Sequence, residues 1–180
     1  MPAPVETVCP LIVISSTTIE VKPAMSVVAA PKVNVDEPNV VVSSADGKVT
    51  EIVTEKEPIN GEICKRVTIF LSVFNVHVNR VPIGGTIEDI RYNPGKFLAA
   101  FNPKASMDNE QNIILINNGK TNVLVKQIAG LIARRIVCWP NKGDQYQPGQ
   151  RYGLIRFGSR VDILLPENIK LSVVCGDIVS

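Results

Sequence analysis

Three short stretches of the sequence carry side chains that could take part in nucleophilic chemistry. They are "SSADGKV" with Asp46, "SVFNVHVNRVP" with His77, and "RFGSRVD" with Gly158 and Ser159. A serine nucleophile needs a base to accept its proton, histidine has a suitable pKa near neutral pH, and an aspartate can orient that histidine. His77 is the one histidine in the sequence and therefore the one candidate for this base. The composition permits an Asp46, His77, Ser159 constellation but does not show that the three side chains meet.

Each stretch also has a purely structural explanation. Asp46-Gly47 is a common hairpin-turn dipeptide, and His77 falls in an alternating strand pattern where a structural histidine is at least as frequent as a catalytic one. The Gly158-Ser159 pair interrupts "LIRFGSRVDILLP", which otherwise has the pattern of one buried strand. A glycine inside a strand commonly marks a bulge, a bend or a close approach. The residues alone leave both explanations open.

The elements that must position these residues are almost all β-strands. Valine and isoleucine dominate short segments bounded by Gly, Pro, Asn and Asp, which predicts strands within residues 39–53, 64–74, 84–92, 112–118, 121–130, 134–139, 151–158 and 161–166. Glycine turns at 45–48, 117–120 and 141–144 occur at the intervals of a sandwich or a partly closed barrel. We expect a mainly β, barrel-sandwich (hammerhead-like) single domain. Little helix is expected, the best candidate being a turn or two over residues 105–112, capped by Ser106.

Composition narrows the class of protein. The 180 residues suit one domain with a core of its own, and 45% apolar with 20% charged residues is typical of a globular protein. A formal charge of +2 gives no argument for nucleic acid as a partner. The four cysteines, at positions 9, 64, 138 and 175, lack paired ligand spacing, so we expect no metal site, and free thiols suit a reducing compartment. No apolar run approaches the length of a membrane span.

Three longer stretches together resemble a known family. They are "IFLSVFNVHVNRVPIGGTI", "VLVKQIAGLIARRIVCW" and "GDQYQPGQRYGLIRFGSRVDILLP", in that order along the chain. They resemble the phosphatidylserine decarboxylase family, in particular its short bacterial and archaeal-type branch. The resemblance runs from about Val40 to the C-terminus, which divides the chain into a divergent, proline-containing arm (1–39) and a decarboxylase-like domain (40–180). The arm could add an edge strand or two, or be loosely held.

The resemblance implies a self-processing proenzyme. In this family the serine of the Gly-Ser motif, here Ser159, attacks the carbonyl of Gly158 and turns the amide into an ester. Elimination and hydrolysis then leave a covalent pyruvoyl group at the new N-terminus. Residues 159–180 would form the smaller chain and stay with residues 1–158 as a heterodimer. His77, together with Asp46, is the implied activator of Ser159.

The implied reaction is the decarboxylation of phosphatidylserine, or a related serine phospholipid, to phosphatidylethanolamine. Decarboxylation leaves a carbanion, which needs a conjugated acceptor, and a pyruvoyl carbonyl supplies one without an added cofactor. His77 is also the candidate proton donor for this step. For the lipid phosphate, Arg80, Arg134 and Arg160 are weak candidates, because a guanidinium matches phosphate well but solvated arginines are equally common.

The implied partners are a phospholipid substrate and the cytoplasmic face of a membrane, to which the protein would bind peripherally. Exposed β edges are compatible with a homodimer. The family's C-terminal continuation beyond the final Gly-Asp turn is cut short at Ser180, and its hydrophobic N-terminal segments are replaced by the arm. These departures favour an alternative, a non-catalytic barrel-sandwich binding module of the same fold. Retention of Asp46, His77 and the Gly-Ser pair favours the enzyme.

Overall fold

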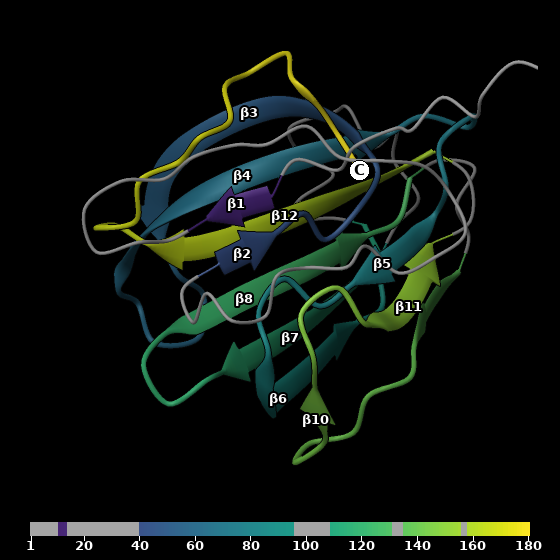
Figure 1. Cartoon of the computed structure of the whole chain (residues 1–180). Helices are drawn as coiled ribbons and strands as arrows, with labels where there is room; N and C mark the ends of the chain where they lie inside the picture. The colour runs from purple at the N-terminus through teal and green to yellow at the C-terminus, as the bar shows by residue number, and fades with distance from the viewer. Residues whose placement is uncertain (1–10, 14–39, 96–108, 131–134, 156–157) are drawn as a thin grey trace, which may run out of the picture.

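A computed structural model gives the fold for residues 11–13, 40–95, 109–130, 135–155 and 158–180 (Figure 1). The described residues contain strands and turns but no helix. The strands are β1 (Leu11–Val13), β2 (Val40–Val42), β3 (Gly47–Lys56), β4 (Ile63–Leu71), β5 (Val78–Arg80), β6 (Gly85–Asn93), β7 (Gln111–Asn117), β8 (Asn122–Ile128), β9 (Ile136–Cys138), β10 (Gln145–Tyr146), β11 (Arg151–Ile155), β12 (Ser159–Pro166) and β13 (Ile178–Val179).

Most of these strands belong to one antiparallel sheet. Its order is β10-β6-β7-β8-β12-β4-β3-β13, and it curls into a half-barrel (Figure 1). A smaller sheet, β5-β11-β9, and the pair β1-β2 complete the described fold. The predicted mainly β, barrel-like architecture with little helix is confirmed. The described residues contain no helix that is long and apolar enough to cross a membrane.

Strand β12 is the centre of the large sheet. It pairs with β4 on one side and β8 on the other, and all of its residues except Pro166 are buried. Val161, Ile163 and Leu165 alternate onto the face that packs in the main hydrophobic core, whereas Leu164 packs in a smaller cluster on the opposite face. The strand is therefore buried on both faces, which explains its apolar run from Ile163 to Leu165.

The Gly-Ser pair does not interrupt a single strand. β11 belongs to the small sheet and β12 to the large one, so the chain passes from one sheet to the other just before Ser159. The two strands predicted over 151–158 and 161–166 correspond to β11 and β12, and the break between them is a change of sheet. The sequence pattern did not reveal that the two strands belong to different sheets, because pairing depends on tertiary contacts.

Two other local predictions also need correction. The Asp46-Gly47 pair is not a hairpin turn, because β2 pairs with β1 and β3 pairs with β4 and β13. His77 lies directly before β5 rather than within a strand.

The remaining predictions are resolved in part. Of the helix expected over 105–112, residues 105–108 lie outside the described residues, and Gln111 and Asn112 are in β7. The arm supplies one described strand, β1, antiparallel to β2, and its other residues lie outside the described part.

The central position of β12 gives a test of the fold. Ile163 is 0% exposed in this strand, and Ile178 is 70% exposed in the edge strand β13. Ile163→Ala should lower the free energy of unfolding by about 2–5 kcal/mol, because it leaves a cavity in the core. The matched change Ile178→Ala should alter it by about 0.5 kcal/mol or less. Urea unfolding followed by circular dichroism measures both, and equal losses would contradict the described strand order.

Candidate active site

The structure brings Ser159 and His77 together, although 82 positions separate them in the sequence. The distance from Ser159 Oγ to His77 Nδ1 is 3.4 Å. Ser159 is the first residue of β12. His77 is held by β11, because the backbone N–H of Ile155 in β11 donates to the His77 carbonyl (3.1 Å). The small sheet therefore positions the histidine and the large sheet positions the serine.

The backbone at Gly158 has a conformation that favours glycine. Its φ angle is +66°, in the left-handed region that residues with a Cβ rarely adopt. A Cβ built on Gly158 would meet no atom within 4 Å, so backbone conformation rather than crowding accounts for the glycine. The left-handed Gly158 lies directly before β12, at the point where Ser159 Oγ approaches His77.

His77 is half-buried, and this burial lowers its pKa. Hydrogen bonds to the backbone of Ser72 and Ile155 oppose that shift. Ser159 itself is 0% exposed. A neutral imidazole next to a hydroxyl that is shielded from water is the arrangement that general-base catalysis requires.

Asp46 lies at the same end of the sheet as this pair. Ser159 is opposite Leu71 in β4, and Gly47, the first residue of β3, lies next to the Lys48–Phe70 pair, so the residue before Gly47 approaches the end where Ser159 begins β12. Burial raises the pKa of Asp46, and the charge of Arg80 lowers it. The direct partnership of Asp46 with His77 remains a prediction, whereas its electrostatic partner in the structure is Arg80.

The arginines proposed for a lipid phosphate have different surroundings. The Arg80 guanidinium donates from Nη1 to the carbonyl of Gly149 (3.0 Å) and acts on Asp46. Arg134 lies outside the described residues. Arg160 is next to Ser159 in β12 and therefore points to the opposite face, where Asp162 accepts from its Nε (2.6 Å) and Nη2 (2.9 Å). The structure thus does not bring Arg160 to the face that carries Ser159, and its charge is already paired.

A buried chain of side-chain amides links β5, β7 and β8, and the sequence analysis missed it. Asn112 Nδ2 donates to Gln127 Oε1 (3.1 Å), and Gln127 Nε2 donates to Asn79 Oδ1 (2.8 Å). Asn79 lies in β5, two residues after His77. Gln127 is opposite Val161, which alternates onto the same face as Ser159.

Burial accounts for these amides being bonded to one another. Asn79 and Gln127 are 0% exposed, and buried polar groups need partners. Asn112 also hydrogen-bonds the Cys138 thiol, whose pKa burial raises to about 11. A signal was present in the sequence, since Gln127 occupies an inward position of the alternating run "NVLVKQIAG". A polar residue at a core position predicts a buried network, but not its partners.

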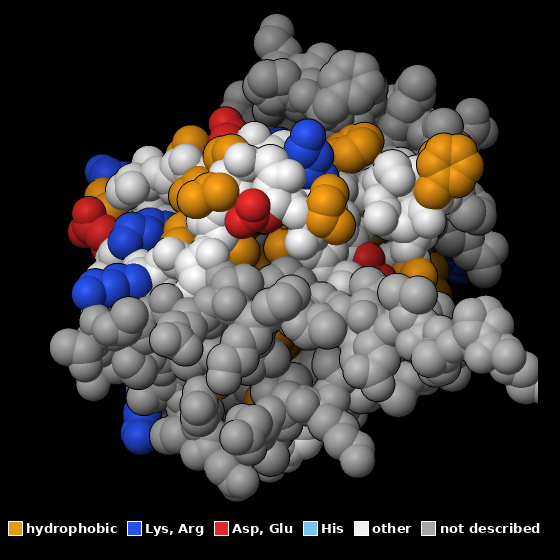
Figure 2. All heavy atoms as spheres, turned by 45° about the horizontal axis from the view of Figure 1, so that its top comes forward, with side chains coloured by type: hydrophobic (Ala, Val, Ile, Leu, Met, Phe, Trp, Pro, Cys, Tyr) orange, Lys and Arg blue, Asp and Glu red, His pale blue; other side chains and the backbone are white. Residues whose placement is uncertain are grey.

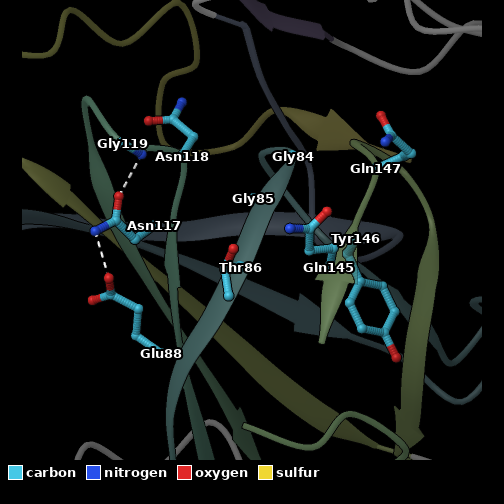
Figure 3. A pocket seen from close by; sticks show the side chains of 10 residues that line it. All are labelled: Gly84, Gly85, Thr86, Glu88, Asn117, Asn118, Gly119, Gln145, Tyr146 and Gln147. Carbon is cyan, nitrogen blue, oxygen red and sulfur yellow. Dashed lines mark hydrogen bonds between the residues drawn. The ribbon is translucent and has the colours of Figure 1, made fainter. Parts of the chain in front are cut away.

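A polar pocket of about 510 Å³ is separate from this site (Figure 3). It lies where the start of β6, the β7–β8 turn and β10 meet, and none of its lining residues belongs to the Ser159–His77 site. Glu88 Oε1 accepts from Asn117 Nδ2 (2.6 Å), and Asn117 Oδ1 accepts from the backbone N–H of Gly119 (2.5 Å). These bonds tie the lining together. Within the described residues, no cluster of three or more His, Cys, Asp and Glu could hold a metal ion.

The geometry defines a class of site. A shielded serine hydroxyl faces a histidine of lowered pKa, and both adjoin a peptide bond that follows a left-handed glycine in a half-barrel of strands. Such a site can activate a serine toward its own backbone. The sequence model described as phosphatidylserine decarboxylase matches residues 28–180, and the chain belongs to this family.

Curated relatives support the same assignment. The phosphatidylserine decarboxylase proenzyme of Geotalea uraniireducens (strain Rf4) is 51% identical over 140 residues, which cover 77% of this chain and 66% of the relative. The proenzyme of that name from Magnetococcus marinus is 49% identical over 139 residues, covering 76% and 64%. The chain therefore spans slightly less than two thirds of the length of these relatives. No solved structure matches it.

The amide chain gives a prediction for the site. Gln127→Leu keeps a similar volume but leaves Asn79 and Asn112 buried without this partner, so the free energy of unfolding should fall by about 1–3 kcal/mol for each stranded amide. Asn122→Ala, an exposed change in the same strand, should alter it by about 0.5 kcal/mol or less. Urea unfolding measures both. If the two variants were equally stable, the described amide chain would not contribute to stability.

Proposed function

We propose that the chain cleaves itself at the Gly158–Ser159 bond and then decarboxylates phosphatidylserine, or a related serine phospholipid, to phosphatidylethanolamine. The observation that carries the proposal is the 3.4 Å approach of Ser159 Oγ to His77 Nδ1 beside a left-handed glycine. The relatives' printed name, phosphatidylserine decarboxylase proenzyme, supports both parts. The same contact favours an enzyme over a non-catalytic binding module, because binding alone does not require a base next to a serine.

Cleavage would follow from the local geometry. His77 accepts the proton of Ser159 Oγ as the oxygen attacks the carbonyl carbon of Gly158. A C–O bond forms, the peptide C–N bond breaks, and the proton passes to the departing nitrogen, which leaves an ester. Loss of the Ser159 α-proton then expels the Gly158 carboxylate and leaves a dehydroalanine, which tautomerises to an imine by taking a proton at its β-carbon. Water then hydrolyses the imine and releases ammonia. The products are a chain that ends at Gly158 and a chain that begins with a pyruvoyl group.

The surroundings of Ser159 fit a pyruvoyl group at this position. β12 stays paired with β4 and β8 when the bond before it opens, so the new chain end is held in the sheet beside His77. Such a group supplies a conjugated carbonyl that can take up the electrons released by decarboxylation. His77 would hold a proton next to the reacting centre, and the buried position would limit the access of water.

The proposal includes the partners. The substrate is a phospholipid, the two pieces of the chain stay together as a heterodimer, and the protein acts peripherally at the cytoplasmic face of a membrane. The described cysteines, Cys64, Cys138 and Cys175, are free thiols, which suits a reducing compartment. The edge strands β10 and β13 offer unpaired backbone groups that a homodimer could use.

Self-cleavage has a direct test. The purified protein should contain two chains, the smaller comprising residues 159–180, and Ser159→Ala should leave one chain of full length because the nucleophile is gone. Ser172→Ala changes another serine of the small chain and should cleave as the wild type does. A denaturing gel and the intact mass of each sample decide the matter. An uncleaved wild-type protein would refute the proposal.

The pKa of His77 predicts the pH dependence of cleavage. The base must be neutral, and burial lowers its pKa from the ordinary value of 6.5, so the neutral form persists as the pH falls to that value. The cleavage rate should therefore fall on acidification through a midpoint below pH 6.5. A precursor made by cell-free translation, diluted into buffers from about pH 5 to about pH 8, gives the profile on gels. A midpoint above 6.5 would contradict the assigned role.

A further inference from the structure

The turn that leads into His77 displays apolar side chains to solvent. It connects β4 to β5 (Figure 1), and it exposes 45% of Val73, 96% of Phe74 and 40% of Val76. Single exposed hydrophobic residues are ordinary on protein surfaces. Elsewhere in the described part of the chain, exposed large hydrophobics are spread over several elements. Figure 2 shows one face of the molecule, on which hydrophobic side chains are interspersed with charged ones. Three within four consecutive residues are a concentrated apolar tip.

Hydrogen bonds give this turn a defined shape. The backbone N–H of Asn75 donates to the Ser72 carbonyl (3.0 Å). In return, Asn75 Oδ1 accepts from the Ser72 backbone N–H (2.8 Å) and from Ser72 Oγ (2.7 Å). The turn is therefore closed at its base by Ser72 and Asn75, and Phe74 is held outward between them. The exposure of Phe74 therefore follows from a turn that hydrogen bonds between Ser72 and Asn75 hold in shape.

The same turn is attached to the reacting pair. It begins at Ser72, directly after β4, and it ends at His77, which hydrogen-bonds the backbone of Ser72. Ser159 Oγ lies 3.4 Å from His77. The apolar tip and the imidazole thus belong to one six-residue segment. A surface that binds the tip would therefore also hold the Ser159–His77 site at a fixed distance from that surface.

We propose that Val73, Phe74 and Val76 form an anchor that enters the surface of a lipid bilayer and presents the Ser159–His77 site to lipid headgroups. The inference rests on the proposed function, because a phospholipid keeps its hydrocarbon chains in the bilayer and the site must come to the headgroup. A convex tip with a fully exposed ring suits a deformable lipid phase, whereas a protein partner would have to offer a matching pocket. Aromatic rings also favour the interfacial layer.

Vesicle sedimentation tests the anchor. Wild-type protein should sediment with vesicles of phosphatidylcholine and phosphatidylserine, and Phe74→Ser should weaken this binding by about tenfold, the amount expected when one large apolar side chain no longer leaves water. Ile63→Ser is the matched control, because Ile63 is 46% exposed at the opposite end of β4. It should bind as the wild type does. Binding of Phe74→Ser that equals the wild type would overturn the anchor.

A second variant reports insertion directly. Trp139 is the one tryptophan of the sequence, so Phe74→Trp combined with Trp139→Phe places the sole indole at the tip. Its fluorescence should shift to shorter wavelength when vesicles are added, because the ring leaves water. An emission maximum that does not move in the presence of vesicles would overturn the anchor even if the protein sediments.

The same samples separate the anchor from the proposed function. A denaturing gel of each sample reports cleavage at Gly158–Ser159, independently of lipid. A protein that stays one chain but loses vesicle binding in Phe74→Ser would support the anchor while refuting the proposed function. A cleaved protein whose vesicle binding ignores Phe74 would refute the anchor and leave the proposed function standing.

Discussion

The passage of the backbone from β11 to β12 through a left-handed Gly158 is the constraint on which the site depends. β11 belongs to the sheet that fixes His77, and β12 belongs to the sheet that fixes Ser159. If β11 and β12 formed one continuous strand, residues 151–166 would belong to a single sheet. The two sheets would then not meet at Ser159 and His77. The change of sheet within three residues creates the contact, and glycine permits the backbone angle that the change requires.

Electrostatic environments on the two faces of β12 follow from its alternation. Ser159 points toward the site, where burial favours neutral groups and lowers the pKa of His77. Arg160 points the other way, into a network with Asp162, and Arg66 lies between Glu51 and Glu55 on the same part of the sheet. Paired charges thus occupy one face of the strand, whereas the face that carries Ser159 meets the half-buried His77.

Much of this could be predicted from the sequence, because period-two alternation and glycine turns are local signals. They placed the main strands correctly, and the order of three motifs gave the family. What they could not give was partnership between distant elements. The hairpin turn considered for Asp46-Gly47 was wrong, and the change of sheet at Gly158 was not foreseen, because pairing depends on tertiary contacts. The Asn79–Gln127–Asn112 chain was missed for the same reason, since a buried amide shows its position in a pattern but not its partner.

The central place of β12 has a consequence for how the molecule is made. Residues on either side of Gly158 contribute strands to the same sheet, and β12 fills the gap between β4 and β8. Neither residues 1–158 nor residues 159–180 therefore contain a complete hydrophobic core. Each segment would expose unpaired sheet edges to water if it were synthesised separately. Under the proposed self-cleavage, one continuous polypeptide would therefore fold first, and the Gly158–Ser159 bond would break afterwards. Until then, that bond would serve as a temporary assembly tether.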